Sequence, residues 1–88
     1  MNAIAAKPDV DRVLQLVRGI ATSLVDHEDG ISVSASTGTE CTLIELRTAH
    51  GEVGQVIGKE GRISKAIHAI LNAHSAKAGH RFSLEILE

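Results

Sequence analysis

Residues 56–63, with the sequence VIGKEGRI, constrain the fold of this chain more than any other stretch. An apolar segment enters a Gly-x-x-Gly turn formed by Gly58 and Gly61, and a helical pattern leaves it. Glycine adopts backbone angles that a side chain forbids and lets another backbone approach closely. The turn also delivers the N-terminus of a helix, whose free N–H groups and dipole favour an anion. The sequence therefore predicts a phosphate-binding turn.

Positive charge gathers at this helix start. This segment contains three basic residues, Lys59, Arg62 and Lys65, and one carboxylate, Glu60. The whole chain, in contrast, carries a net charge of −2. An acidic chain with one basic spot is not expected to bind polyanions everywhere, but it fits modest binding in one groove. The candidate contact residues are Val56, Ile57, Gly58, Lys59, Glu60, Gly61, Arg62, Ile63 and Lys65.

Two other glycine-rich phosphate loops can be excluded. A P-loop needs a glycine at position 53 and a Ser or Thr after Lys59, where this chain has Val53 and Glu60. The dinucleotide fingerprint needs a glycine two residues before Gly58, and none is there. What remains is Gly-x-x-Gly followed by a helix, the element with which KH domains clamp a nucleic-acid backbone. Taken alone, those four residues fit a plain helix–helix turn equally well.

Composition indicates one small globular domain. The chain has 88 residues, of which 43% are hydrophobic and 23% charged. The single cysteine, Cys41, excludes an intrachain disulfide and favours a reducing compartment. Residues 1–7 do not resemble a signal peptide, and no apolar run approaches the roughly 18 residues of a membrane span. We expect a cytoplasmic protein with a domain over residues 8–88 and a loose leader before it.

Hydrophobic periodicity predicts the elements in order. A helix begins near Pro8, with its apolar stripe at Val10, Val13, Leu14, Val17, Ala21 and Leu24. Two strands follow, at 31–36 with alternating serines and at 41–48, joined by a hairpin at 37–40. Leu43 breaks the alternation of the second strand, as expected for a central strand. A short helix precedes the turn, and a longer helix after it carries the stripe Ile63, Ala66, Ile67, Ile70, Leu71 and His74.

The chain closes with a strand after Gly79, the expected helix stop. Phe82, Leu84 and Ile86 alternate there with polar residues. The predicted fold is α+β, in the order α-β-β-α-α-β. The first two strands pair antiparallel, and the second and last lie parallel through a right-handed crossover. Helices cover one face of this three-stranded mixed sheet and leave the other face open.

This order resembles the type II KH arrangement. Four segments are similar to the small bacterial KhpA-type KH proteins: residues 23–27, the run at 56–62, residues 65–67 and the closing residues 84–86. The resemblance implies single-stranded RNA binding, and action as an RNA chaperone or post-transcriptional regulator. It also implies a homodimer, or pairing with a larger KH protein of the KhpB (Jag) type, and links to cell shape and cell-wall organisation.

The groove that reads bases in this family lies beside the turn-bearing helices. Val56, Ile57 and Ile63 are its candidate apolar floor, although the same residues would serve as core in any fold. Glu60 departs from the basic or neutral residue found in many nucleic-acid-binding members and would repel a phosphate. The only aromatic residue is Phe82, so base stacking is scarce and sequence preference should be weak.

Catalysis and cofactors have little support in the sequence. The five histidines show no pairing at i, i+3 or i, i+4, so no helical metal pair is expected. Cys41 is expected to be a packed strand thiol. We expect no enzyme activity, cofactor, metal, membrane association or small-molecule substrate. Two hypotheses remain, an RNA-binding module and a protein-interaction module in which RNA binding is incidental.

Overall fold

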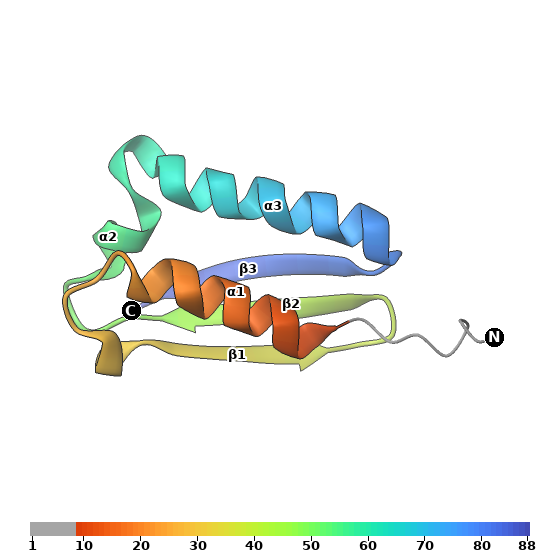
Figure 1. Cartoon of the computed structure of the whole chain (residues 1–88), viewed down its shortest axis with the longest axis horizontal. Helices are drawn as coiled ribbons and strands as arrows, with labels where there is room; N and C mark the ends of the chain where they lie inside the picture. Colours follow the sequence, from red (N-terminus) through yellow and green to blue (C-terminus); the bar gives the residue numbers. More distant parts are fainter. Residues whose placement is uncertain (1–8) are drawn as a thin grey trace.

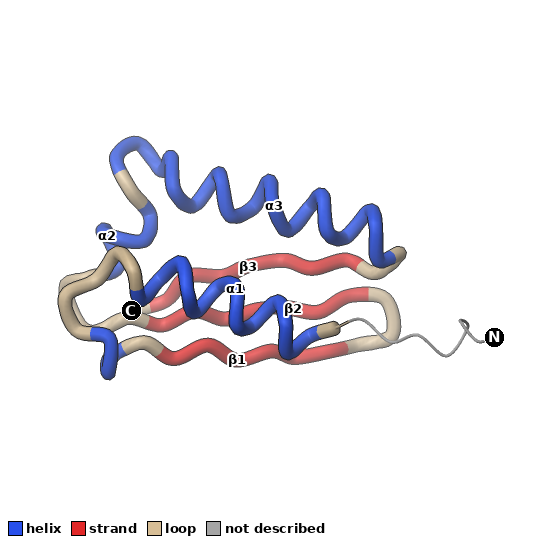
Figure 2. Tube along the Cα trace, in the orientation of Figure 1, coloured by secondary structure: helices blue, strands red, loops and turns tan. Residues whose placement is uncertain are grey.

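The computed structural model describes residues 9–88 (Figure 1). Its elements follow the predicted order, with two short 3-10 turns added: α1 (Val10–Thr22), η2 (Glu28–Gly30), β1 (Ser32–Thr37), β2 (Cys41–Arg47), α2 (Val53–Ile57), η3 (Lys59–Gly61), α3 (Arg62–Ala78) and β3 (Arg81–Leu87). Helices lie over one face of the sheet, as Figure 2 shows. The α+β order is therefore confirmed, while the predicted leader and Pro8 lie outside the described residues.

Helix α1 begins with a side-chain cap. Asp9 Oδ1 accepts a hydrogen bond from Arg12 N at 3.1 Å, which satisfies one of the free N–H groups of the first turn. Val13, Val17 and Ala21 form its buried stripe. The prediction that this apolar stripe continues to Leu24 is wrong. The helix ends at Thr22, so the backbone leaves the helical period and Val25 is buried while Leu24 is 37% exposed.

The sheet has the order β1-β2-β3. Strands β1 and β2 pair antiparallel, with Thr37 opposite Thr42, and β2 and β3 pair parallel, with Cys41 opposite Arg81. This topology confirms the hairpin and the crossover. Strand β2 is central, which explains why Leu43, on the face without helices, is still half-buried.

The two faces of β2 differ in burial. Thr42, Ile44 and Leu46 are fully buried beneath the helices. Cys41 belongs to the opposite set of alternating residues and is exposed. The prediction of a packed thiol was wrong because successive strand residues point to opposite faces, and Thr42 occupies the covered one.

Helix α3 packs only part of its predicted stripe. Ile67 and Leu71 are buried, whereas Ala66 is exposed and the Ile70 side chain is 47% exposed. The helix stops at Gly79, which has a left-handed φ of 67° as predicted. Within residues 9–88 no helix is long and apolar enough to cross a membrane.

Candidate nucleic-acid interface

The Gly-x-x-Gly turn joins α2 to α3 at one end of the molecule (Figure 1). Gly58 N donates to Gly54 O at 2.9 Å and closes α2, while Gly61 N donates to Gly58 O at 3.0 Å and closes the turn. No side chain caps the N-terminus of the 17-residue α3. The positive end of a long helix is therefore presented beside an exposed turn.

Both glycines are required by the backbone. Gly58 has φ 80° and ψ 169°, and a Cβ on it would lie 2.7 Å from Ile63 Cγ1. Gly61 has a left-handed φ of 74°. A side chain at position 58 would collide with the first turn of α3, and one at position 61 would be strained. The close approach of Gly58 to Ile63 fixes how the turn enters the helix.

The charged side chains of the turn are exposed, but two of them are paired. Arg62 Nη2 donates to Glu60 Oε1 at 3.2 Å. Glu60 reaches this position with a φ of 56°, in the region that non-glycine residues rarely adopt. Lys59 and Lys65 are exposed and form no side-chain hydrogen bond or ion pair with any residue of 9–88. A bound anion would find two free ammonium groups and one guanidinium that already has an acceptor.

The three apolar candidates differ in accessibility. Val56 is fully buried and belongs to the core, so its side chain has no surface from which to contact a base. Ile57 and Ile63 are half-buried on either side of the turn. Ile57 and Ile63 therefore keep part of their surface accessible next to the charged turn, whereas Val56 does not.

Sequence reasoning missed a contact that holds α2 in place. His27, in the loop after α1, donates its backbone N–H to Glu52 Oε1 at 3.3 Å, and its Nδ1 lies 2.6 Å from Glu52 Oε2. Glu52 directly precedes α2, and its side chain is 9% exposed against 70% for His27. The side-chain hydrogen bond, followed by charge attraction, raises the pKa of His27 above 6.5. The same hydrogen bond lowers the pKa of Glu52 below 4.5.

These pKa shifts predict a pH dependence of stability. The His27 contribution is present below its unfolded pKa of 6.5 and is lost as the pH rises through its higher folded value. The Glu52 contribution is present above 4.5 and is lost as the pH falls through its lower folded value. We expect the melting temperature to fall as the pH rises above about 6.5, because His27 then loses its proton.

His27→Asn supplies the comparison, because its amide can donate to Glu52 without titrating. Thermal melts of both proteins over this pH range isolate the His27 contribution, since the other histidines are common to both. If the melting temperatures of the two proteins changed equally with pH, protonated His27 would not be a stabilising group.

Among residues 9–88 no group of three or more His, Cys, Asp or Glu side chains is arranged to hold a metal. Two of the histidines instead contact other side chains of the domain. His80 is buried, with Nε2 2.8 Å from Thr42 Oγ1. His74 packs its ring against Phe82, with the ring centroids 5.0 Å apart.

The model of one protein family, described as KhpA/KhpB, KH domain, matches residues 14–86 of this chain. This chain belongs to the KhpA/KhpB KH-domain family. The match begins within α1, ends one residue before the end of β3 and includes the Gly-x-x-Gly turn. The family resemblance predicted from the sequence is therefore confirmed.

Individual KhpA proteins are similar over most of their length. "RNA-binding protein KhpA" of Borreliella burgdorferi is 41% identical over 75 residues, covering 85% of this chain and 92% of that protein. The protein of the same name from Clostridium acetobutylicum is 44% identical over 73 residues, covering 83% of this chain and 97% of its own. That of Aquifex aeolicus is 45% identical, covering 83% and 92%.

The KH fold also matches part of a solved structure, that of a point variant of Aquifex aeolicus Era bound to GDP.AlF4−. The TM-score is 0.57 at 20% identity, and the match covers 85% of this chain but only 29% of the Era chain. At this identity the likeness concerns the fold alone.

Proposed function

We propose that this KH domain binds single-stranded RNA by gripping the sugar-phosphate backbone with the Gly58-Lys59-Glu60-Gly61 turn and the N-terminus of α3. The observation that carries the proposal is an exposed turn, with both glycines at positive φ, at the uncapped start of a 17-residue helix. Such a helix start attracts phosphate through its N–H groups and dipole. The names of the similar KhpA proteins support the same function.

The charges around the turn determine the expected affinity for RNA. Lys59 and Lys65 are free to contact phosphates, and Arg62 can do so by exchanging Glu60 for a phosphate oxygen. An exposed ion pair of this kind contributes little free energy, so Arg62 can leave Glu60 easily. The small free energy needed to break the pair still lowers the affinity for RNA. We therefore expect modest affinity, dominated by the backbone and similar for unrelated sequences.

Base contacts are limited to the apolar surface next to the turn. Ile57 and Ile63 offer a half-buried apolar surface on which a base can lie, whereas Val56 is buried. Phe82, the only aromatic residue, is 1% exposed and cannot stack on a base. Weak discrimination among RNA sequences follows from this composition.

In the cell, this function would be that of a cytoplasmic RNA chaperone or post-transcriptional regulator acting as a homodimer or with a KhpB-type partner. The family description, which covers both KhpA and KhpB, supports a KH partner. The second candidate is a protein-interaction module with incidental RNA binding. The net charge of −2 and the Glu60–Arg62 ion pair favour that alternative.

Glu60→Lys distinguishes the two candidates. The substitution removes a carboxylate beside the expected phosphate, frees Arg62 and adds a cation. At an exposed site in physiological salt, this should stabilise the RNA complex by about 0.5–1 kcal/mol. Fluorescence anisotropy with two unrelated labelled single-stranded RNAs should then show a roughly two- to fivefold gain for both, because phosphates carry no base information.

Glu40→Lys is the matched control, because it makes the same charge change in the exposed β1–β2 hairpin, at the other end of the molecule from the turn. Its RNA affinity should stay close to that of the parent. If Glu60→Lys gains no more than Glu40→Lys, the turn does not lie at a phosphate and the interaction module is the better assignment.

A further inference from the structure

Strand β1 has one side that no other strand covers. The strand order β1-β2-β3 places it at the edge of the sheet, and among residues 9–88 no helix or loop runs along its outer side (Figure 2). An unpaired edge presents a row of backbone N–H and C=O groups to another strand. Edge strands are commonly protected from such pairing by charged side chains or proline, but β1 has the sequence SVSAST and contains neither. The edge of β1 is therefore open to a further strand.

The hairpin bond shows which backbone groups of β1 point outward. Gly38 N donates to Cys41 O at 2.7 Å, so Gly38 faces β2. In an antiparallel strand, the N–H and C=O groups of one residue point to the same side, and those of the next residue point to the other side. The serines of β1, an even number of positions from Gly38, therefore face β2. The other three residues present their backbone groups at the outer edge, where no backbone hydrogen bond within residues 9–88 uses them: Val33, Ala35 and Thr37.

The row of free backbone groups has a defined start. Ile31, just before β1, also faces outward, but its N–H donates to Glu28 O at 3.0 Å and its carbonyl accepts a hydrogen bond from Arg18 Nη2 at 3.4 Å. A partner strand can therefore pair with the three free residues of β1 but not with Ile31. This limit restricts the registers that a partner strand can adopt.

We propose that two copies of this chain pair through β1, antiparallel and about a two-fold axis, and so join their sheets. With Ala35 opposite Ala35 of the second copy, Val33 lies opposite Thr37, and every free N–H and C=O group of both strands has a partner. A shift that centres the axis on Ser34 would instead place Thr37 opposite Ile31, whose groups are already bonded. The first register is therefore the one that leaves the fewest backbone groups unpaired.

The side chains favour the same pairing. Ser34 lies opposite Ser36 of the second copy, and serines that face each other across two strands are small and can exchange hydrogen bonds. No residue of β1 is charged, so no like charges oppose each other between the strands. The register also brings the hairpin after β1, with Glu40, toward Arg18 of the second copy, and these two charges are opposite. A second copy therefore complements both the backbone and the charges of this edge.

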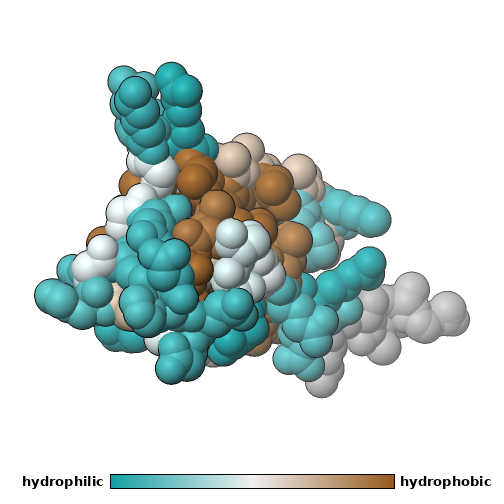
Figure 3. All heavy atoms as spheres, turned by 60° about the vertical axis from the view of Figure 1, so that its left-hand side comes forward, coloured by the Kyte–Doolittle hydropathy of each residue, from teal (hydrophilic) through white to brown (hydrophobic). Residues whose placement is uncertain are grey.

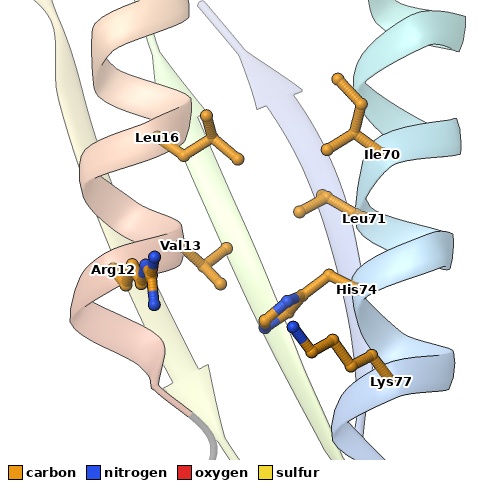
Figure 4. A pocket seen from close by; sticks show the side chains of 7 residues that line it. All are labelled: Arg12, Val13, Leu16, Ile70, Leu71, His74 and Lys77. Atoms are coloured by element: carbon orange, nitrogen blue, oxygen red, sulfur yellow. The ribbon is translucent and has the colours of Figure 1, made fainter.

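The proposed pairing leaves the other surfaces of the domain free. Leu16 and Ile70 face each other across a hollow between α1 and α3, which no residue of β1 lines (Figure 4). Figure 3 shows hydrophobic residues gathered in one area bordered by hydrophilic ones, whereas β1 carries three serines. Pairing at this edge therefore depends on backbone hydrogen bonds. It involves neither the hollow nor the Gly-x-x-Gly turn and is compatible with other contacts through α3.

The test is disulfide formation between two variants of the full chain, Ser34→Cys and Ser36→Cys, each with Cys41→Ser so that the introduced thiol is the only one. In the proposed register the two thiols oppose each other in a mixed pair, within reach of a disulfide, whereas each faces a serine in a pair of identical copies. An equal mixture oxidised with glutathione disulfide should give at least about fivefold more covalent dimer than either variant alone. Intact mass, with one variant labelled with nitrogen-15, identifies the mixed dimer.

Ser83→Cys, also with Cys41→Ser, is the matched control. Ser83 lies on the same helix-free face but on β3, at the opposite edge of the sheet. Its mixture with Ser36→Cys should give no more covalent dimer than the single variants. The proposal would be overturned if the mixture of Ser34→Cys and Ser36→Cys gave no more covalent dimer than this control, or if Ser34→Cys alone crosslinked as well as the mixture.

Amide hydrogen exchange of the parent gives a second measurement without any substitution. The amides of Val33, Ala35 and Thr37 should exchange about tenfold more slowly at millimolar than at micromolar protein concentration. Those of Ser34 and Ser36 should not change, because they already face β2. Circular dichroism checks that the cysteine variants are folded. Exchange of the three outward amides that is independent of concentration would contradict pairing between copies and would favour an extended segment of another protein as the occupant.

Discussion

Gly58→Ala is expected to destabilise the domain and to weaken the proposed RNA binding together. The new Cβ would lie 2.7 Å and 2.9 Å from side-chain atoms of Ile63 and 3.0 Å from Ile63 N, in a backbone region with φ 80°. Holding a non-glycine residue there costs about 1–3 kcal/mol. For a domain of this size, the melting temperature should fall by roughly 5–20 °C.

The RNA effect follows from the same collision. To relieve it, the turn must move away from Ile63, and the start of α3 then no longer lies against the phosphate that the turn would hold. We expect RNA affinity to fall by about tenfold or more at a temperature where the variant is still folded. Circular dichroism melts and anisotropy titrations measure the two effects separately.

Gly54→Ala is the control for this substitution. Gly54 lies in α2, has no positive φ, and a Cβ on it meets nothing within 4 Å. Alanine should therefore be neutral or stabilise α2 by about 0.5–1 kcal/mol, with RNA binding unchanged. If Gly58→Ala and Gly54→Ala behave alike, the close approach at Gly58 is not what shapes the turn.

Replacing Lys59 and Glu60 together by aspartate should reduce RNA affinity by about tenfold or more while the fold survives. Both side chains are exposed, and aspartate tolerates the left-handed φ of 56° at position 60 better than most residues. Two carboxylates would then oppose the helix dipole at the site where a phosphate is expected. Thermal unfolding should shift little.

Lys77→Asp separates this local effect from a change in net charge. It alters the charge by the same amount, but on the last turn of α3, at the opposite end of that helix from the Gly-x-x-Gly turn. Its RNA affinity should remain within about twofold of the parent, apart from weak long-range screening terms. A double aspartate variant that binds RNA as tightly as the parent would mean that the turn is not a clamp.

The elements that the sequence predicted correctly are those governed by local patterns. The glycines at 58, 61 and 79 stand where the backbone has positive φ, and the serine alternation of β1 and the turn before β2 were recognisable from adjacent residues. The parallel pairing of β2 with β3 followed from the helices that connect them, because a helical crossover joins parallel strands. The place of the candidate turn could be predicted because its chemistry lies within a few consecutive residues.

Burial along α3 could not be predicted in the same way. A helical period identifies an apolar stripe, but the width of the covered part depends on where α1 lies. Ile67 and Leu71 are buried, while Ala66 and Ile70 stay exposed. The exposure of Ala66 and Ile70 therefore could not be recognised from the sequence, in which both belong to the predicted apolar stripe.

Contacts between distant residues were missed for a related reason. His27 and Glu52 are 25 positions apart, and Thr42 and His80 are 38 apart. Nothing in the spacing of such pairs indicates that they meet. The Glu60–Arg62 pair is only two positions apart, but Glu60 has a left-handed backbone, which non-glycine residues rarely adopt.

The surroundings of Phe82 give this protein built-in spectroscopic probes. The chain lacks Trp and Tyr, and its one phenylalanine has the His74 ring at 5.0 Å and the His80 ring at 5.2 Å. The phenyl ring current should displace the NMR signals of these two imidazoles from those of His68, which lies on the exposed side of α3. His74 then reports on the packing around Phe82 and His68 on the exposed side of the turn-bearing helix. Changes in the core and at the turn-bearing helix can therefore be followed in one unlabelled sample, from side chains that the chain already carries.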